Sequence, residues 1–368
     1  MPELPEVETI AQKLSPALVG HEVVQVDVGW DRTIDRPDVV SFRKALIGSR
    51  FTGIGRRGKF LVMDLDTGQS LLVHLRMSGK FSLSMNGDVE AEQHTRLRLR
   101  LDNGLWVVYI DPRKFGRFYL VDDPQEIVAD LGPEPLGPDF TAEALWERLQ
   151  NRRGEIKRLL LDQQFIAGLG NIYVSEALWQ ARIHPARPAN SLSGEECYRL
   201  HGAIVDVLRL GIVHGGTSLE DRQYVYPDGG TGEHQHHLSV YDRAGDRCRR
   251  CGYELQRIVQ GQRSTYFCPV CQPYFIADGS AARVWQDENL DEERKLTVET
   301  KTLNIAGMSC NMCVKHVTHA LKNVDGVVDV HVQLEPPTAT VTYDPQVADL
   351  AAFKAAVAEA DYEVVGEA

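Results

Sequence analysis

The chain lacks the features of a membrane or secreted protein. No apolar run approaches the roughly 18 residues that a membrane-spanning helix needs. The first residues, MPELPEVETI, are acidic and lack the basic and apolar regions of a signal peptide. We therefore expect a cytoplasmic protein with no membrane partner.

Cysteine is also scarce, with seven residues in a chain of 368. Six of them form three Cys-x-x-Cys pairs and Cys197 stands alone, which argues against a disulfide framework. In a reducing compartment this spacing favours metal sites. The length is too great for one ordinary core and predicts two to four domains.

Positive charge is in deficit, because the formal net charge is -12. From Trp285 onward 6 lysines and arginines face 15 acidic residues, whereas before it the counts are 34 and 37. In this earlier part the basic residues gather locally. Such clusters can line a groove for a phosphate backbone, although each one alone is typical of solvated surface. The clusters are Arg50, Arg56, Arg57 and Lys59; Arg96, Arg98 and Arg100; Arg113, Lys114 and Arg117; Arg152, Arg153, Lys157 and Arg158; and Arg247, Arg249 and Arg250.

Hydrophobic periodicity predicts a multidomain α+β protein. Residues 3–19 are typical of a helix with Pro5 in its first turn. From about 22 to 122, short β-type runs separated by turns predict an antiparallel β-sandwich or barrel. The proline-rich stretch 130–140 is typical of a linker, residues 141–220 are helical in pattern, and residues 221–236 have the composition of a mobile loop.

The C-terminal part has a different pattern. Residues 286–301 are charged and poor in apolar residues, which predicts a second linker. From about 302 the order is strand–helix–strand–strand–helix–strand. That order is typical of a ferredoxin-like domain.

The spacing Cys248-x2-Cys251-x16-Cys268-x2-Cys271 indicates a zinc site. Four thiolates complete a closed tetrahedral shell, so the zinc is expected to be structural. Two unrelated redox motifs are the alternative. GQRST, between the two pairs, is expected to form a hairpin turn in which Arg263 can reach a phosphate; by itself Arg263 is equally typical of a surface charge.

Six motifs resemble those of the formamidopyrimidine-DNA glycosylase family and follow its order across residues 1 to about 275. They are PELPEVE, RRGKFL, HLRMSGKF, DPRKFG, LLDQQFIAGLGNIYVSEALW and STYFCPVCQ. The resemblance implies a β-sandwich with a leading helix, a helix-two-turn-helix domain and a zinc-finger hairpin, with DNA bound between them. It places a catalytic domain at 1–130, a DNA-binding domain at 131–235 and the zinc finger at 236–275. Beyond the part that this resemblance covers, we expect a linker at 276–300 and a separate C-terminal domain at 301–368, which is a departure from the family.

The resemblance makes Pro2 the nucleophile of a bacterial, monomeric DNA-repair enzyme. Its amine would attack C1′ of an oxidised purine nucleotide (8-oxoguanine or a formamidopyrimidine) in double-stranded DNA and form a Schiff base. Cleavage at the resulting abasic site would follow by β,δ-elimination. Proline has a free amine only at the N-terminus, so Met1 must first be removed. Without the resemblance, Pro2 is more typical of a residue that begins a helix.

Glu3 is the adjacent carboxylate and would serve as acid or base at the sugar. Glu6 lies one helical turn further on, on the same face. The alternative is that these acids stabilise the helix dipole, which is compatible with the first role.

Further site residues follow from the same resemblance. Contacts to the sugar-phosphate backbone are assigned to Lys59, His74, Lys157, Asn171 and Arg263, of which Lys59 and Arg263 are also expected to take part in catalysis. The gap left by an everted base is expected to be filled by Met77, Arg113 and Phe115. Alone, Met77 and Phe115 are more typical of core residues.

The lesion loop of the family corresponds to residues 217–237, which depart from the family pattern at Arg222, Gln223, Glu233 and His234. This leaves the preferred base open. We expect His234, His236 and His237 to be solvated loop residues and not metal ligands.

The segment IAGMSCNMC resembles the metal loop of heavy-metal-associated domains over residues 302–366. Cys310 and Cys313 offer two soft sulfurs, which suit Cu(I) better than harder ions. Tyr362 matches an aromatic position near the metal loop, and a copper donor or acceptor protein would be a partner. A redox Cys-x-x-Cys is the alternative.

Two other functions stay open at this point. One is an endonuclease VIII-like glycosylase for oxidised pyrimidines, which HLRMSGKF with its methionine disfavours. The other is a non-catalytic, metal-responsive DNA-binding protein, which the joint presence of Pro2, Glu3 and Lys59 disfavours.

Overall fold

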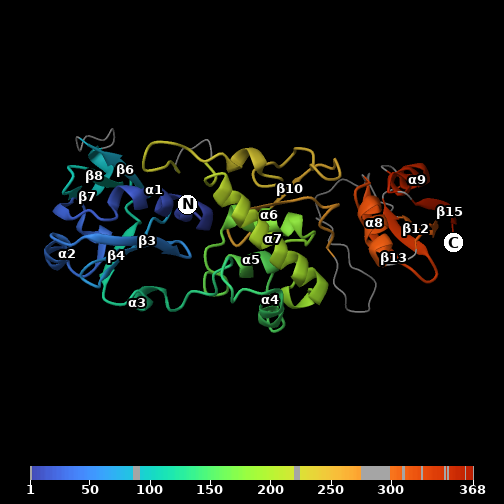
Figure 1. Ribbon diagram of the computed structural model, residues 1–368, viewed down its shortest axis with the longest axis horizontal. Coiled ribbons are helices and arrows are strands. Elements are labelled where there is room, and N and C mark those ends of the chain that lie inside the picture. Colours follow the sequence, from blue (N-terminus) through green and yellow to red (C-terminus); the bar gives the residue numbers. More distant parts are fainter. Residues whose placement is uncertain are drawn as a thin grey trace. The chain divides into compact units, whose positions relative to one another are not determined.

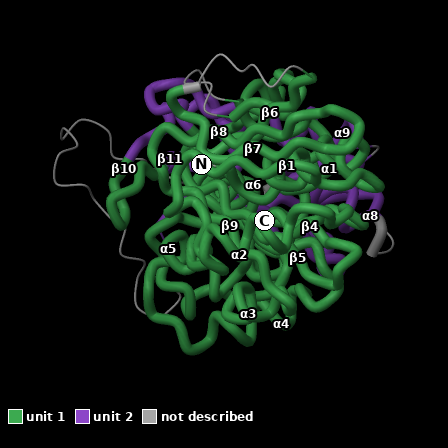
Figure 2. Tube along the Cα trace, turned by 90° about the vertical axis from the view of Figure 1, so that its left-hand side faces the viewer, with its two compact units in different colours: residues 1–241, 258–265 green, residues 242–257, 266–368 purple. Residues whose placement is uncertain are grey.

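The computed structural model describes residues 2–85, 92–218, 224–274, 299–308, 311–324, 326–343, 345, 348–360 and 362–367. The chain divides into two compact units (Figure 2), formed by residues 1–241 with 258–265 and by residues 242–257 with 266–368. Among the described residues, no helix has the length and apolar character needed to span a bilayer.

The first helix, α1 (Leu4–Leu18), begins directly after Pro2 and Glu3. Pro5 occupies its first turn, where the missing N–H costs nothing because it would have no helical partner. Val7, Ile10, Leu14 and Leu18 recur at helical spacing and are buried. The helix therefore packs one apolar stripe into the core of the N-terminal domain.

Two sheets form the predicted β-sandwich (Figure 1). The first has the order β1 (Val23–Val28), β7 (Thr95–Leu101), β8 (Trp106–Ile110) and β6 (Lys80–Ser84). The second has the order β2 (Ile34–Arg36), β9 (Arg117–Val121), β5 (Ser70–His74), β4 (Phe60–Leu65) and β3 (Phe51–Arg57). Neighbouring strands are antiparallel except for β2 and β9. Buried residues of both sheets, of α1 and of helix α2 (Val39–Leu46) share one core.

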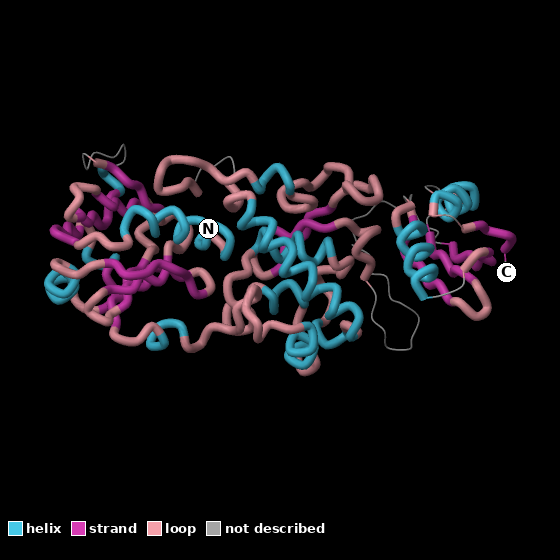
Figure 3. Tube along the Cα trace, in the orientation of Figure 1, coloured by secondary structure: helices cyan, strands magenta, loops and turns pink. Residues whose placement is uncertain are grey.

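A helical domain follows the sandwich, and Figure 3 shows its helices apart from the strands of residues 23–121. After the short α3 (Gln125–Val128), the helices are α4 (Ala142–Leu149), α5 (Ile156–Leu160), α6 (Asn171–Gln180) and α7 (Gly194–Val213). Thr141 and Ser193 cap α4 and α7 by accepting hydrogen bonds from backbone N–H groups. Single-turn 3₁₀ helices in the described residues are η1 (Asp31–Thr33), η2 (Glu92–His94), η3 (Ala189–Ser191) and η4 (His234–His237).

Strands β10 (Gln256–Gln260) and β11 (Arg263–Phe267) form a two-stranded sheet. They are joined by Gly261 and Gln262, whose φ angles of 54° and 64° are those of a two-residue hairpin turn. The predicted turn, GQRST, is thus shorter than expected. Arg263 is not in the turn but begins β11.

The C-terminal domain has the predicted ferredoxin-like order. Its elements are β12 (Glu299–Ala306), α8 (Asn311–Lys322), β13 (Val327–Gln333), β14 (Thr338–Tyr343), α9 (Leu350–Glu359) and β15 (Glu363–Glu367). The sheet order is β13-β14-β12-β15, with antiparallel neighbours. Its buried residues form a core of their own.

Candidate active site and DNA-binding residues

Pro2 and Glu3 lie buried at the N-terminus of α6. The Glu3 carboxylate is 3% exposed and accepts hydrogen bonds from the backbone N–H groups of Ile172 (3.0 Å) and Tyr173 (3.4 Å). These are unpaired donors of the first helical turn, where the helix dipole favours an anion. The backbone N–H of Leu4 donates to the carbonyl of Gly168 at 3.0 Å. The first residues are therefore fixed against the helical domain.

The glycines of the GLGN segment make this approach possible. A Cβ atom at Gly170 would lie 2.2 Å from the Glu3 carboxyl carbon, and one at Gly168 would lie 2.7 Å from a Leu4 methyl carbon. Gly168 also has a φ angle of +87°, which L side chains rarely adopt. The absence of side chains at these glycines therefore leaves the space that Glu3 and Leu4 occupy.

Glu6 links the backbone of Glu3 to Thr217, the first residue of the predicted lesion loop. One of its carboxylate oxygens accepts from the N–H of Glu3 at 2.8 Å. The other accepts from the Tyr173 hydroxyl and from the N–H of Thr217, both at 2.7 Å. Burial and the nearby Glu3 charge raise the pKa of Glu6. The hydrogen bond between Glu6 and the backbone of Glu3 is part of a capping box at the N-terminus of α1, in line with the stabilising role of these acids that was the alternative.

Lys59 is buried, although it lies in the turn between β3 and β4. Burial and the charge of Arg263 lower the pKa of its ammonium group, which Glu3 and Glu6 raise, and the result is a pKa of about 8. Glu3, Glu6 and Arg263 influence the pKa of Lys59 because all three charges lie near its ammonium group. An ammonium group with so low a pKa is poorly hydrated and attracts an incoming phosphate strongly.

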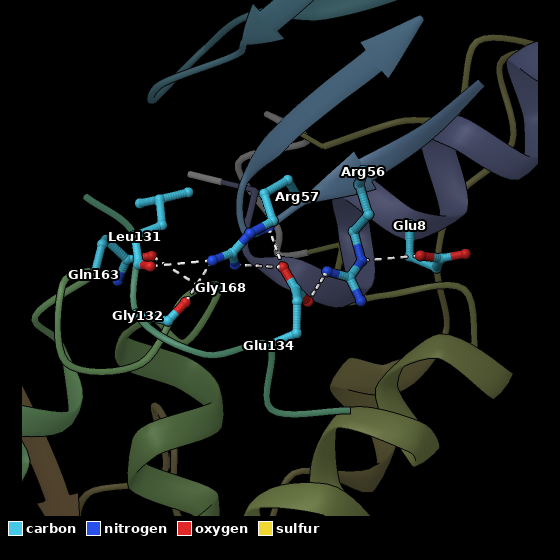
Figure 4. A network of polar contacts seen from close by, with 9 residues as sticks. Glu8, Arg56, Arg57, Leu131, Gly132, Glu134, Gln163 and Gly168 are labelled. Atoms are coloured by element: carbon cyan, nitrogen blue, oxygen red, sulfur yellow. Dashed lines mark hydrogen bonds and ion pairs between the residues drawn. The ribbon is translucent and has the colours of Figure 1, made fainter. Parts of the chain in front are cut away.

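Glu134 holds the end of β3, next to the turn that contains Lys59, and Figure 4 shows its carboxylate between Arg56 and Arg57. Its carboxylate accepts from Arg56 at 2.5 Å, from Arg57 at 3.0 Å and from the backbone N–H of Gly58 at 2.5 Å. Burial alone would raise the pKa of Glu134, but the arginine charges and these hydrogen bonds lower it. Arg57 also donates to the carbonyls of Leu131 and Gly132. The predicted linker at 130–140 is therefore a fixed part of the site.

Lys157 and Asn171 meet at one carbonyl oxygen. The Lys157 ammonium donates to the carbonyl of Ser264 at 3.2 Å, and the Asn171 amide donates to the same carbonyl at 2.9 Å. Ser264 follows Arg263, so both residues hold the start of β11. Lys157 is 0% exposed, and burial lowers the pKa of its ammonium group to about 7. Both were predicted to contact DNA; here they support the exposed Arg263, and the DNA contact stays a prediction.

His74, at the end of β5, is neutral in this structure. Burial, together with the charges of Arg76 and Lys59, lowers the pKa of its imidazole to about 3. Its Nδ1 accepts from the N–H of Arg76 at 3.0 Å, which leaves the proton on Nε2. His74 can thus donate an uncharged N–H to a phosphate oxygen.

The three predicted gap-filling residues are exposed. Met77 is 40% exposed and Phe115 is 47% exposed, which excludes the core role that their residue types alone favour. The guanidinium carbon of Arg113 lies 5.0 Å from the centre of the Phe115 ring. Exposed apolar side chains beside an arginine are suited to enter a base stack.

The predicted mobile loop is partly described. Residues 219–223, including Arg222 and Gln223, lie outside the described residues. From Tyr224 onward the chain is held by the Tyr224 hydroxyl, which donates to Gly215 at 3.0 Å, and by Asp228, which pairs with Lys13 at 2.9 Å. The described part is therefore anchored on two sides.

His234 is 3% exposed, so the expectation of a solvated side chain is wrong for this residue. Its ring stacks on Tyr173 at 5.5 Å, and its Nδ1 lies 3.2 Å from Nδ1 of His214. Burial lowers the pKa of His234 to about 4, so it is an uncharged packing residue. His236 and His237 are exposed.

The four cysteines of the predicted zinc site converge. Their sulfur atoms all lie within 4.8 Å of one another, with Cys248 and Cys271 3.9 Å apart and Cys251 and Cys268 3.4 Å apart. Zinc–sulfur bonds of about 2.3 Å in a tetrahedron give separations close to these. Within the described segments no other set of three or more ligand side chains converges in this way. The residues fit a structural Zn²⁺ with no open position.

The predicted copper site is described only in part. Cys310 lies outside the described residues, and Cys313 is half-buried in the first turn of α8. Tyr362 lies next to Gly307, because a Cβ atom there would be 3.5 Å from the Tyr362 ring. The Tyr362 hydroxyl is 3.5 Å from Nδ1 of His316. Among the described residues, Tyr362 therefore lies close to Gly307 and to His316 of α8, and its place beside a metal stays a prediction.

Family models match the first three parts of the chain. Residues 1–118 match a formamidopyrimidine-DNA glycosylase N-terminal domain, residues 131–223 its H2TH domain and residues 245–273 a zinc finger found in FPG and IleRS. A formamidopyrimidine-DNA glycosylase of Herpetosiphon aurantiacus is 46% identical over 275 residues, which cover 74% of this chain and 100% of that protein. The chain belongs to the formamidopyrimidine-DNA glycosylase family. A relative from Chloroflexus aurantiacus is 48% identical and covered to 98%.

Solved structures agree with this family. A complex between the Lactococcus lactis enzyme and DNA containing an abasic site matches with a TM-score of 0.69 at 37% identity, over 73% of this chain and 99% of that one. The Thermus thermophilus enzyme matches with a TM-score of 0.67 at 40% identity, over 74% and 98%. Residues 302–363 match a heavy-metal-associated domain. The glycosylase family thus accounts for about three quarters of the chain, and a second family accounts for most of the rest.

Three carboxylates of this glycosylase, the buried Asp111 and Glu176 and the partly buried Glu134, were missed by sequence reasoning. Glu176 accepts three successive backbone N–H groups, those of residues 239–241, at 2.8 to 2.9 Å. Glu134 and Asp111 likewise accept from backbone groups. The available signals were the acidic residue between two prolines at 133–135 and the aspartate that precedes Pro112.

Proposed function

We propose that the protein is a bifunctional DNA glycosylase and abasic-site lyase of base excision repair, acting on oxidised purines. The observation that carries the proposal is the fixed placement of Pro2 and Glu3 at the N-terminus of α6, within the field of Lys59, Lys157 and Arg263. A free N-terminal amine, a carboxylate and several cations are the groups that Schiff-base excision at a phosphodiester requires.

The reaction would begin once Met1 is removed. The Pro2 nitrogen attacks C1′ of the everted nucleotide, and the bond from C1′ to the damaged base breaks as the electron pair leaves with the base. The carboxyl group of Glu3, the next residue, can pass a proton to O4′ as the C1′–O4′ bond breaks and the sugar ring opens. The secondary amine gives a cationic iminium, which makes the C2′ proton acidic and permits β- and then δ-elimination of the flanking phosphates.

The cations would hold the strand during these steps. Lys59 and Arg263 supply charge to the phosphates, and His74 offers its neutral Nε2–H. Lys157 and Asn171 act through the Ser264 carbonyl, which fixes Arg263. Met77, Arg113 and Phe115 would enter the gap left by the everted base.

Borohydride trapping tests this function. Protein with a processed N-terminus should form a covalent adduct on duplexes with 8-oxoguanine opposite cytosine, and Pro2→Gly should release base more slowly. An N-terminal tag should abolish the adduct without unfolding the protein. Faster excision of thymine glycol would instead indicate an enzyme for oxidised pyrimidines, and absence of any adduct would indicate a non-catalytic DNA-binding protein.

We further propose that the C-terminal domain binds monovalent copper through Cys310 and Cys313. The supporting observation is the position of Cys313 in the first turn of α8 with Tyr362 beside Gly307, since thiolates near a helix N-terminus have a lowered pKa and soft sulfurs suit Cu(I). Competition with a Cu(I) chelator, compared with Zn²⁺ binding and with the Cys313→Ser variant, tests the metal. Unchanged excision after deletion of residues 300–368 would exclude regulation of repair by this domain.

A further inference from the structure

A single buried carboxylate, that of Asp111, holds both turns that carry the gap-filling residues. Asp111 is 1% exposed and follows β8. One of its oxygens accepts from the Ser78 hydroxyl at 2.6 Å and from the N–H of Arg113 at 3.2 Å. The other accepts from the N–H of Gly116 at 2.8 Å. Ser78 follows Met77, so the same carboxylate contacts the Met77 turn and the 113–116 turn.

Asp111 is itself held firmly. Its N–H donates to the carbonyl of His94 at 2.9 Å, and its carbonyl accepts from the side chain of the buried Arg96 at 2.8 Å. Both turns also pack against the hydroxyl group of Tyr109. A Cβ atom added at Gly79 would lie 2.2 Å from this hydroxyl, and one added at Gly116 would lie 1.7 Å from it. Neither turn can therefore shift without disturbing the other.

The gap-filling side chains depend on this anchor because solvent surrounds much of them. Met77 and Phe115 are 40% and 47% exposed, so packing does not fix their positions. Arg113 lies over the Phe115 ring at 5.0 Å. Their relative placement is thus set by the backbone of the two turns, which Asp111 joins.

Resting on the proposed function, we propose that Asp111 is a positioning residue that sets the opposite-base selectivity of excision. It touches neither the reacting atoms nor the orphan base. It fixes Arg113, which would face that base, relative to Met77, which would enter from the other turn. Asparagine in its place has one acceptor oxygen and one donor NH2, so a donor would face a donor at one of the two turns.

The test compares Asp111→Asn with Asp64→Asn in the full-length chain. Asp64 also accepts from a serine hydroxyl, that of Ser70 at 2.8 Å, but between β4 and β5. Single-turnover excision of 8-oxoguanine is measured opposite cytosine and opposite adenine, together with borohydride trapping on a duplex that already has an abasic site. For Asp111→Asn, excision opposite cytosine should fall by about tenfold to a hundredfold, as expected for a misplaced contact. The rate ratio between cytosine and adenine should fall toward one.

Trapping at a preformed abasic site should stay within about threefold of wild type, because no damaged base has to be everted. Asp64→Asn should match wild type throughout. An equal loss on every substrate with a lower melting temperature, or an unchanged cytosine-to-adenine ratio, would overturn the proposal. Ser78→Ala removes only the hydrogen bond between Asp111 and the Met77 turn, so it should give a smaller fall in excision. This variant still tests the proposal if Asp111→Asn does not fold. Failure of the wild type to form any adduct would instead refute the proposed function.

Discussion

Replacing Lys157 by methionine is expected to stabilise the glycosylase part of the chain. The ammonium group is fully buried, and its pKa is about 7 compared with 10.5 for an exposed lysine. This difference corresponds to about 5 kcal/mol against the charged form, at 1.36 kcal/mol per pKa unit. Relaxation of the folded protein reduces such penalties, so we expect a gain of about 1–3 kcal/mol at pH 6.

The substitution should leave no buried polar group without a partner. The carbonyl of Ser264 keeps its hydrogen bond from Asn171 at 2.9 Å. The hydroxyl of Ser175 keeps its own bond to the carbonyl of Asn171 at 2.8 Å. Methionine matches the length of the lysine stem, so no large cavity is created.

The pH dependence gives the sharper test. Because the folded protein releases the Lys157 proton at a lower pH than the unfolded chain, it binds fewer protons between about pH 7 and 10.5. Wild-type stability should therefore rise with pH across this window. The methionine variant lacks this contribution, so its advantage should be constant below about pH 7 and should shrink as the pH rises toward 10.5.

Urea unfolding followed by tryptophan fluorescence measures this effect in the full-length protein. All five tryptophans precede residue 286, so the signal omits the C-terminal domain. Lys44→Met, at an exposed position on α2, is the matched control and should show no such pH-dependent advantage. A variant less stable than wild type at pH 6 would show that the ammonium stabilises the fold through Ser175 and Ser264, and the reasoning would fail. DNA affinity should fall in Lys157→Met, because Arg263 loses one of its two supports.

Three further predictions follow from the same site. Glu134→Gln should destabilise the protein by about 1–3 kcal/mol and lower adduct yield, whereas the exposed Glu147→Gln should do neither, as urea unfolding and trapping would show. DNA affinity in gel-shift titrations should fall above pH 8 as the Lys59 ammonium, with a pKa of about 8, loses its proton, and Lys59→Arg should remove this fall. Zinc removal, or Cys251→Ser, should weaken DNA binding while circular dichroism shows the helices of residues 142–213 intact.

Much of the fold could be predicted because its signals are local. The apolar spacing of α1 and the first-turn Pro5 place that helix within one residue of its observed bounds at each end. The strand and helix patterns after residue 302 likewise give the order of the ferredoxin-like domain. The cysteine spacing predicts a convergent site because two Cys-x-x-Cys pairs are enough to bring four sulfur atoms together, whatever the rest of the sequence.

The surroundings of these charged groups could not be predicted because the residues that bind them are distant in sequence. Glu134 bonds to Gly58 across 76 residues, and Lys157 bonds to Ser264 across 107. A lysine in a basic cluster is ordinarily exposed, so no local pattern indicated that Lys157 is fully buried. His234 was likewise expected to be solvated, because its contacts are with Tyr173 and His214, which are distant in sequence.

The N-terminus shows why the family resemblance and the geometry are both needed. Chain termini fray unless they are tied down, and a frayed nucleophile cannot be held at C1′. Here the two residues after Pro2 are each bound to the helical domain, Glu3 by the first N–H groups of α6 and Leu4 by the carbonyl of Gly168. The glycines that allow this approach are those of the GLGN segment. The motif at 168–171 and the motif at residues 2–8 thus contact each other directly. We therefore expect substitution of Gly170 to impair catalysis as strongly as substitution of Glu3.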